Sequence, residues 1–301
     1  MSSKIVLRVE NVTKKFGSFM ALDKVSFAVR QGEVVGFVGA NGAGKTTTIS
    51  TILGFIGLTS GQVELFGEVV SPATAHKFHG RIGYAAGDME LPSRLTGRQY
   101  LAFVLHQSGG HHQERYDELC QRFQPQLDKK IGELSRGNRQ KIALIAACMT
   151  EPELLILDEP TSGLDPVMQE VFLDLVREVQ AAGGTVFMSS HYLAEVADVC
   201  SRVILMRTGT IIEDIDAKDL LEKSGKSVSV LTSYKRTRPP KSADDIVSVA
   251  EGELTRMTFV FKGDVAELQQ WIASIKQLHD VEITEYNLEG AFKQLYESEQ
   301  V

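Results

Sequence analysis

The chain has 301 residues, of which 43% are hydrophobic and 24% charged, a globular composition that argues against disorder, collagen or a disulfide scaffold. Its formal charge is −7, whereas a protein that coats nucleic acid normally carries the opposite sign, so we expect no nucleic-acid partner. The three cysteines form no CxxC pair, which indicates a reducing cytosol. No apolar run approaches the roughly 20 residues that span a bilayer, so we expect no membrane crossing.

The first elements in chain order predict the start of an α/β fold. Alternating apolar residues over 5–9 and 25–29 predict two half-buried strands. A continuous apolar run at 34–38 follows, then a glycine-rich turn and a helix from Lys45 to about Leu53. Strand, loop and helix in this order begin a parallel α/β unit.

The middle of the chain continues this pattern after an interruption. Residues from about 87 to 150 are rich in helix formers and predict a helical insertion. Buried strands are expected at 154–157, 185–188 and 202–206. Between the first two lies a helix that Asp165 caps, with Pro166 at its first position. The alternation predicts a mostly parallel sheet covered by helices.

The pattern changes after about residue 222. Strands are expected at 227–231, 246–249, 255–261 and 281–286, with an amphipathic helix at 265–275 and a final helix. We therefore predict two domains: residues 1–222, which include the helical insertion at about 87–150, and a small α+β domain of residues 223–301.

A glycine-rich loop between the strand at 34–38 and the following helix fits the pattern GxxxxGK[ST]. Its backbone N–H groups and the helix N-terminus can cradle phosphate oxygens. Lys45 would reach the β- and γ-phosphates, and the Thr46 hydroxyl would bind Mg²⁺. The predicted ATP-binding residues here are Gly39, Ala40, Asn41, Gly42, Ala43, Gly44, Lys45, Thr46 and Thr47.

Asp158 and Glu159 follow the buried strand at 154–157, at the end where open α/β sheets collect their ligands. Asp158 would hold Mg²⁺, directly or through water, and Glu159 would polarise an attacking water. Considered alone, such an acidic pair is more often a helix cap or a solvated turn. The phosphate loop favours the catalytic interpretation.

A third motif, Leu134, Ser135, Arg136, Gly137 and Asn138, precedes a helix. Ser135 and the Gly137 N–H would form an anion site at that helix N-terminus, the alternative being a simple N-cap. A helix of about 11 residues is roughly 16 Å long, which places Ser135 far from its own nucleotide. We therefore expect a second chain to complete each site.

The motifs occur in the order phosphate loop, Leu134–Asn138, Asp158–Glu159, Asp165 and His191. In this order they resemble the ATP-binding subunit of an ABC transporter over roughly residues 4–215. The resemblance implies an α/β fold of the P-loop NTPase class with an ABC-type ATPase core. It also implies ATP and Mg²⁺ as ligands, ATP hydrolysis coupled to transport, and a head-to-tail dimer that encloses two ATP molecules.

The resemblance also assigns roles that the residues alone do not. His191 would contact the γ-phosphate as part of catalysis, and Asp165 would signal across the dimer. Ser135 and Gly137 of one chain would touch the γ-phosphate of the other. Phe16 would stack on adenine. A lone His is usually structural or solvated, and a lone Phe usually belongs to the core.

Residues 287–292 are similar to the C-terminal motif of ABC-2-type exporter ATPases, with an ordinary terminal helix as the alternative. This resemblance implies a peripheral protein on the cytoplasmic face of the membrane, whose partners are an integral-membrane transporter subunit and a second ATP-binding chain. Two alternatives remain open: a soluble ABC-type ATPase that acts on ribosomes or DNA, and a regulatory ATP switch of low turnover.

Two positions depart from the family pattern. Gly87 stands where the family normally has a glutamine, with Asp88 next, and Arg136 replaces a glycine. Because glycine is conformationally free, we expect a mobile loop and a slow ATPase until a membrane partner contacts residues 87–94. On this hypothesis Gly87→Gln would speed hydrolysis by the isolated chain.

Overall fold

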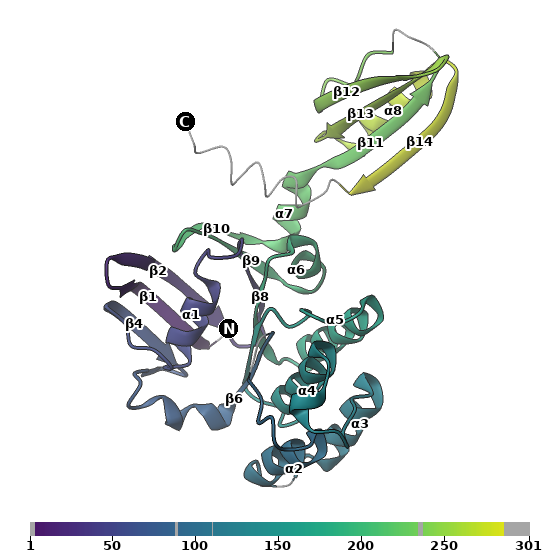
Figure 1. Ribbon diagram of the computed structural model, residues 1–301. Coiled ribbons are helices and arrows are strands. Elements are labelled where there is room, and N and C mark those ends of the chain that lie inside the picture. Colours follow the sequence, from purple (N-terminus) through teal and green to yellow (C-terminus); the bar gives the residue numbers. More distant parts are fainter. Residues whose placement is uncertain (1–3, 88–89, 110, 234–236, 286–301) are drawn as a thin grey trace. The chain divides into compact units, whose positions relative to one another are not determined.

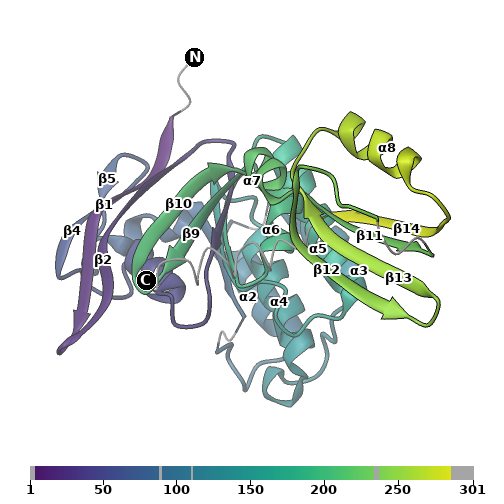
Figure 2. The same ribbon diagram turned by 90° about the horizontal axis from the view of Figure 1, so that it is seen from above.

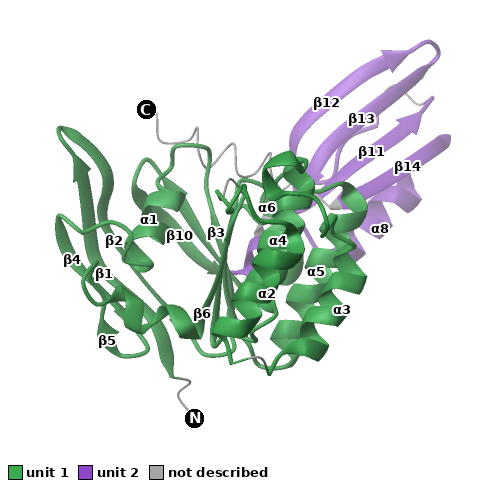
Figure 3. Cartoon of the chain, turned by 60° about the horizontal axis from the view of Figure 1, so that its bottom comes forward, with its two compact units in different colours: residues 1–215 green, residues 216–301 purple. Residues whose placement is uncertain are grey.

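The computed structural model describes residues 4–87, 90–109, 111–233 and 237–285. The chain forms two compact units, residues 1–215 and 216–301, which Figure 3 shows in green and purple. Helix α7 (Ala217–Ser224), which contains the boundary predicted at residue 222, belongs to the second unit.

A six-stranded sheet forms the centre of the first unit, in the order β10-β9-β3-β8-β7-β6. Its strands are β3 (Val34–Val38), β6 (Ile82–Ala86), β7 (Leu154–Asp158), β8 (Thr185–Ser190), β9 (Arg202–Arg207) and β10 (Thr210–Asp216). The five strands from β9 to β6 pair in parallel. The mostly parallel sheet confirms the predicted α/β class.

A second sheet, in the order β2-β1-β4-β5, covers one side of the first unit (Figure 1). Its strands are β1 (Ile5–Phe16), β2 (Phe19–Arg30), β4 (Ser60–Leu65) and β5 (Glu68–Val69). Helix α1 (Lys45–Ile52) packs between the two sheets through the fully buried Ile49 and Ile52. Phe27, Phe37 and Phe187 join the sheets, since their ring centroids lie 5.3 to 5.6 Å apart.

Helices cover the other face of the central sheet, and Figure 1 shows α4 and α5 on the side away from β1 and β2. They are α2 (Gly97–Gln107), α3 (Gln113–Phe123), α4 (Arg136–Cys148), α5 (Pro166–Ala181) and α6 (Leu193–Val199). Short 3-10 helices lie in the connections: η1 (Ala75–Lys77) and η2 (His79–Arg81) precede β6, and η3 (Ile131–Glu133) precedes α4. Helices α2, α3 and α4 fall within the predicted helical insertion. In the described part of the chain, none of the helices has the length and apolar character that a membrane span needs.

The second unit contains an antiparallel sheet in the order β12-β13-β11-β14, with α8 along one face (Figure 2). Its elements after α7 are β11 (Lys226–Thr232), β12 (Ala243–Glu251), β13 (Leu254–Phe261), α8 (Val265–Ser274) and β14 (Leu278–Glu285). Leu268 and Trp271 of α8 pack on this sheet, where Trp271 meets Phe259 edge to face. Residues 287–292 and the predicted final helix lie outside the described residues.

Candidate functional site

The order of the central sheet brings three segments of the sequence to one edge. Strand β8 lies between β3 and β7, and its last residues Ser189 and Ser190 pair with Asp158 and Val38. Because these strands are parallel, the glycine-rich loop, the acidic pair and His191 all follow carboxyl ends at the same edge. A cavity of about 530 Å³ lies there, lined among others by Asn41, Thr46, Gly87, Arg136, Asp158, Glu159 and His191.

The predicted phosphate loop connects β3 to the N-terminus of α1. Gly44 is the N-cap residue and has a φ of 112°, in the left-handed region that favours glycine. A Cβ at this position would also lie 3.0 Å from the Ala21 carbonyl oxygen. The first turn of α1 contains no acidic residue, so the partial positive charge of the helix N-terminus is available to an anion.

Lys45 begins α1 and is only 6% exposed. Its Nζ donates to the Gly39 carbonyl oxygen at 2.7 Å and lies 3.1 Å from Oε1 of Glu159. The ammonium is therefore held at the cavity by oxygen atoms, with which a phosphate group would compete. Thr46 is exposed in the cavity, whereas Thr47 is half-buried in the first turn of α1.

Asp158 and Glu159 occupy different environments at the end of β7. Asp158 is 4% exposed, and its Oδ1 accepts a hydrogen bond from the Ser189 hydroxyl at 2.5 Å. Glu159 has a φ of 51°, a left-handed conformation that costs a non-glycine residue about 1 kcal/mol or more. Its N–H donates to the same Ser189 hydroxyl at 3.0 Å, which stabilises this turn.

The Glu159 carboxylate links two of the predicted site residues. Oε2 lies 2.5 Å from Nδ1 of His191, and the buried Oε1 lies 3.1 Å from Lys45 Nζ. The contact with Lys45 is an ion pair without hydrogen-bond geometry. Neither Asp158 nor Glu159 caps a helix of the described chain, and both line the cavity.

Tyr84 also lines the cavity, although no motif in the sequence indicates a role for it. Burial, followed by the negative charge of Asp158, raises the pKa of its phenol to about 12. The phenol therefore stays protonated near neutral pH and presents a hydrogen-bond donor beside the acidic pair.

The motif Leu134–Asn138 forms the N-terminus of α4. Leu134 is buried, and the exposed Ser135 caps the helix by accepting a hydrogen bond from the Asn138 N–H at 3.3 Å. The structure thus shows the N-cap alternative, while a role toward a second chain's nucleotide stays a prediction. Arg136 lines the cavity of its own chain and donates to the Ser162 hydroxyl at 2.8 Å. A Cβ on Gly137 would lie 2.5 Å from the Gly163 carbonyl oxygen, so only glycine fits there.

Phe16 and Asp165 lie away from this group of contacts. Phe16 ends β1, is 50% exposed, and carries Lys14 Nζ at 4.8 Å from its ring centroid, so a cation covers one ring face. Asp165 caps α5 as the sequence predicts, since its Oδ1 accepts from the Met168 N–H at 3.0 Å. Adenine stacking and signalling across a dimer stay predictions.

The surroundings of Gly87 correct the expected effect of Gly87→Gln. Its N–H donates to the Asp158 carbonyl oxygen at 2.7 Å. A Cβ at this position would lie 2.8 Å from the Glu159 carbonyl oxygen and 3.1 Å from Cβ of Ser162. A side chain would therefore displace the turn that carries Glu159. We now expect Gly87→Gln to slow ATP hydrolysis, where the sequence alone predicts that it speeds hydrolysis. Asp88 lies outside the described residues.

Comparisons with known proteins identify the family of the chain. Residues 22–162 match the family described as ABC transporter. The chain is 34% identical over 251 residues to the uncharacterized ABC transporter ATP-binding protein YhaQ of Bacillus subtilis (strain 168), with 82% of this chain and 83% of that protein covered. It is 35% identical over 227 residues to the bacitracin transport ATP-binding protein BcrA of Bacillus licheniformis, with 73% of each covered. A solved ATP-binding subunit of an ABC transporter is similar with a TM-score of 0.65 and 26% identity, over 72% of this chain and 92% of its own.

We predict that Gly87→Ala slows ATP hydrolysis at least fivefold while ATP affinity changes less than twofold. An extra methyl group in a packed position typically costs about 1–3 kcal/mol, and 1.36 kcal/mol in the barrier is tenfold in rate. Steady-state turnover and nucleotide titration measure the two effects. Gly80→Ala is the matched control, since a Cβ there meets nothing within 4 Å. Turnover equal to or faster than wild type would contradict the close packing at Gly87.

Proposed function

The chain belongs to the ATP-binding subunits of ABC transporters and is an ATPase with the P-loop fold, and we propose that it drives an integral-membrane exporter. The observation that carries the hydrolytic role is the contact of Glu159 with both Lys45 and His191, beside Asp158 in one cavity. The similarity to a bacitracin transport protein supports export.

The residues at the cavity fit a nucleotide with Mg²⁺. Carboxylate and hydroxyl oxygens are the ligands that this hard cation prefers, and Asp158 and Thr46 supply one of each. The Ser189 hydroxyl fixes the orientation of the Asp158 carboxylate. We assign the β- and γ-phosphates to Lys45 and to the backbone N–H groups of residues 39–46. When bound, Mg²⁺ would neutralise phosphate charge.

Glu159 is the proposed general base. Its carboxylate takes the proton of an attacking water, while His191 holds the carboxylate in place from the end of β8. Lys45 would exchange Glu159 for the phosphates as ATP binds, which frees Oε1 for the water. Positioning and electrostatics supply most of the catalysis in phosphoryl transfer. The main requirement for hydrolysis is therefore that the Glu159 carboxylate is held in one position.

We further propose that two such chains form a head-to-tail dimer with two shared sites. The exposed Ser135 and the N–H of Gly137 at the start of α4 would face the γ-phosphate bound by the other chain. Asp165 stands at the start of α5 next to Val167, which is 68% exposed, and would carry the signal across the interface. The N-cap residues Ser135 and Asp165 are both exposed, and the exposed apolar Val167 follows Asp165, which supports a protein contact at the starts of α4 and α5.

The membrane subunit would contact the first unit beside the site. A second cavity of about 480 Å³ lies between the end of β6 and α4, lined by residues that include Leu91, Ser93, Ile131 and Arg139. Gly87 and Arg136 line both cavities, which supports a connection between partner contact and hydrolysis. On this proposal the chain is peripheral on the cytoplasmic face of the membrane.

A tagged full-length chain should therefore co-purify with a multi-span membrane protein from detergent-solubilised membranes. Mass spectrometry of the complex would identify that subunit, and a tagged Lys45→Ala chain serves to test whether nucleotide binding is needed for the contact. Recovery with ribosomes or nucleic acid in place of a membrane protein would favour the soluble alternative and contradict the exporter.

Glu159→Gln should bind ATP and Mg²⁺ but hydrolyse ATP roughly 100-fold more slowly, because an amide keeps the shape and loses the base. Light scattering should then show a dimer that depends on ATP. Glu170→Gln, an exposed position on α5, is the control. Wild-type turnover by Glu159→Gln would show that Glu159 is not the base.

A mixture of Ser135→Arg and Glu159→Gln chains tests the shared sites. Each variant alone should show little activity, Ser135→Arg because it blocks the partner's site and Glu159→Gln because it lacks the base. A mixed dimer carries both changes in one site and neither in the other, so part of the activity should return. Mass measurement confirms that mixed dimers form. If they form and no activity returns, two sites that work independently are excluded.

A further inference from the structure

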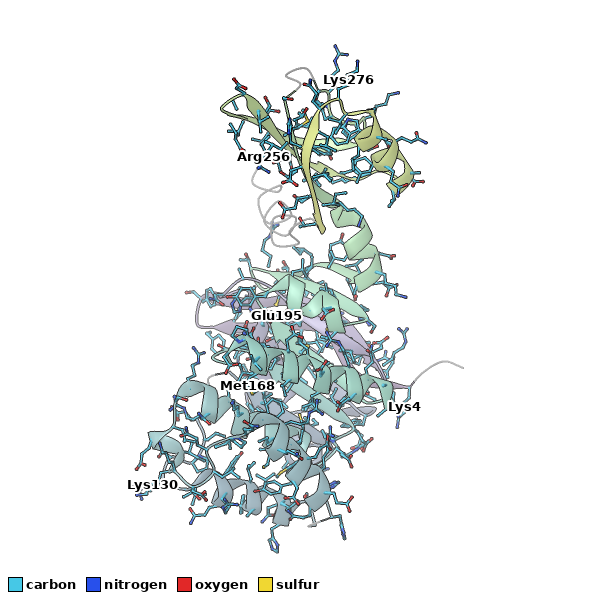
Figure 4. All side chains as sticks on the ribbon, turned by 90° about the vertical axis from the view of Figure 1, so that its right-hand side faces the viewer. Lys4, Lys130, Met168, Glu195, Arg256 and Lys276 are labelled. Carbon is cyan, nitrogen blue, oxygen red and sulfur yellow. The ribbon has the colours of Figure 1, made fainter. Side chains whose placement is uncertain are left out.

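Glu195 is a half-buried carboxylate in the first unit, on α6, that the proposed hydrolysis leaves without a role (Figure 4). Its Oε2 accepts hydrogen bonds from the Thr161 hydroxyl at 3.0 Å and from the Ser190 hydroxyl at 3.3 Å. Both hydroxyl residues are buried, with 6% and 1% exposure. One carboxylate oxygen therefore joins two segments that are 29 residues apart in the sequence.

The two hydroxyl groups stand next to the proposed catalytic pair. Thr161 lies two residues after Glu159, and Ser190 directly precedes His191. Glu159 and His191 are themselves in contact at 2.5 Å. Any separation of the two backbone segments would break that contact. Ser190 also accepts from the Tyr192 N–H at 2.9 Å, which fixes the chain on the other side of His191.

We propose that Glu195 is a positioning residue for ATP hydrolysis, which holds the turn after Glu159 against the end of β8. It acts through Thr161 and Ser190 on the Glu159–His191 contact. The proposal rests on the role assigned above to Glu159 and His191, and it adds a residue outside the motifs that define the site.

The chemistry of the contacts indicates which property of Glu195 matters. Burial raises the pKa of its carboxyl group, and the nearby Glu159 adds to this, whereas the Thr161 and Ser190 hydroxyls and His191 lower it. Thr161 and Ser190 are neutral donors, so what they need is an acceptor oxygen rather than a negative charge. A glutamine supplies that oxygen, and an alanine does not.

The test compares Glu195→Ala and Glu195→Gln in the full chain. Glu195→Ala should lower kcat at least tenfold and change the KM for ATP less than threefold, since the phosphate loop is untouched. Glu195→Gln should stay within threefold of wild type, because its amide oxygen still accepts both hydrogen bonds. Glu170→Ala, on the exposed face of α5, is the matched control and should leave both constants unchanged.

Thr161→Val supplies a second route, since it removes one hydroxyl at nearly constant volume. It should lower kcat at least threefold with KM unchanged. The double variant Thr161→Val/Glu195→Ala should be no slower than Glu195→Ala, because the Thr161 hydroxyl acts only through its hydrogen bond to Glu195. If Glu195→Ala fails to fold, Thr161→Val and Glu195→Gln decide the matter.

Three results would overturn the proposal: wild-type kcat in Glu195→Ala or Thr161→Val, a change confined to KM, or a Glu195→Gln variant as slow as the alanine variant. Glu159→Gln is measured alongside. If it is inactive while Glu195→Ala is normal, only the positioning role fails. If Glu159→Gln itself turns over at the wild-type rate, the assignment of the base fails instead.

Discussion

The site depends on the parallel placement of β8 between β3 and β7. This placement sets Ser189 against Asp158 and Ser190 against Val38, so that groups more than a hundred residues apart meet at one edge. The Ser189 hydroxyl binds the carboxylate of Asp158 and the N–H of Glu159. A register slip of one residue would turn that hydroxyl to the opposite face of the sheet. The geometry of the acidic pair is therefore a property of the sheet as much as of the motif.

The sequence predicted those parts of the site that are contiguous and local. The phosphate loop is read from one strand, one turn and one helix, and the observed β3 and α1 begin at the residues expected for them. Asp165 is recognised as a cap because Pro166 follows it and an amphipathic helix comes next. The acidic pair is found because Asp158 ends an apolar run that only a buried strand explains. Each of these signals lies within about ten residues.

The remaining features depend on contacts between distant segments. Glu195 lies on a short helix where glutamate has no distinguishing pattern, and only the fold brings it to Thr161, which is 34 residues away in the sequence. The residue type at position 87 predicts a mobile loop. The packing of the folded chain restricts this glycine, however, because the pairing of β6 with β7 sets Gly87 against the turn of Glu159. Tyr84 enters the cavity through the same pairing.

The loop from Glu159 to Asp165 is held by four elements. Gly87, at the end of β6, packs against the start of the loop. Ser189 of β8 binds the N–H of Glu159, and Glu195 of α6 binds the hydroxyl of Thr161. Arg136 of α4 binds the Ser162 hydroxyl, and its side-chain carbons pack beside Gly163. A close-packed segment of this kind transmits a displacement rather than absorbing it. Because the loop joins the proposed base to the cap of α5, a shift of α4 or of the end of β6 must reach both ends together. The two positions that depart from the family pattern, Gly87 and Arg136, therefore act on one and the same loop.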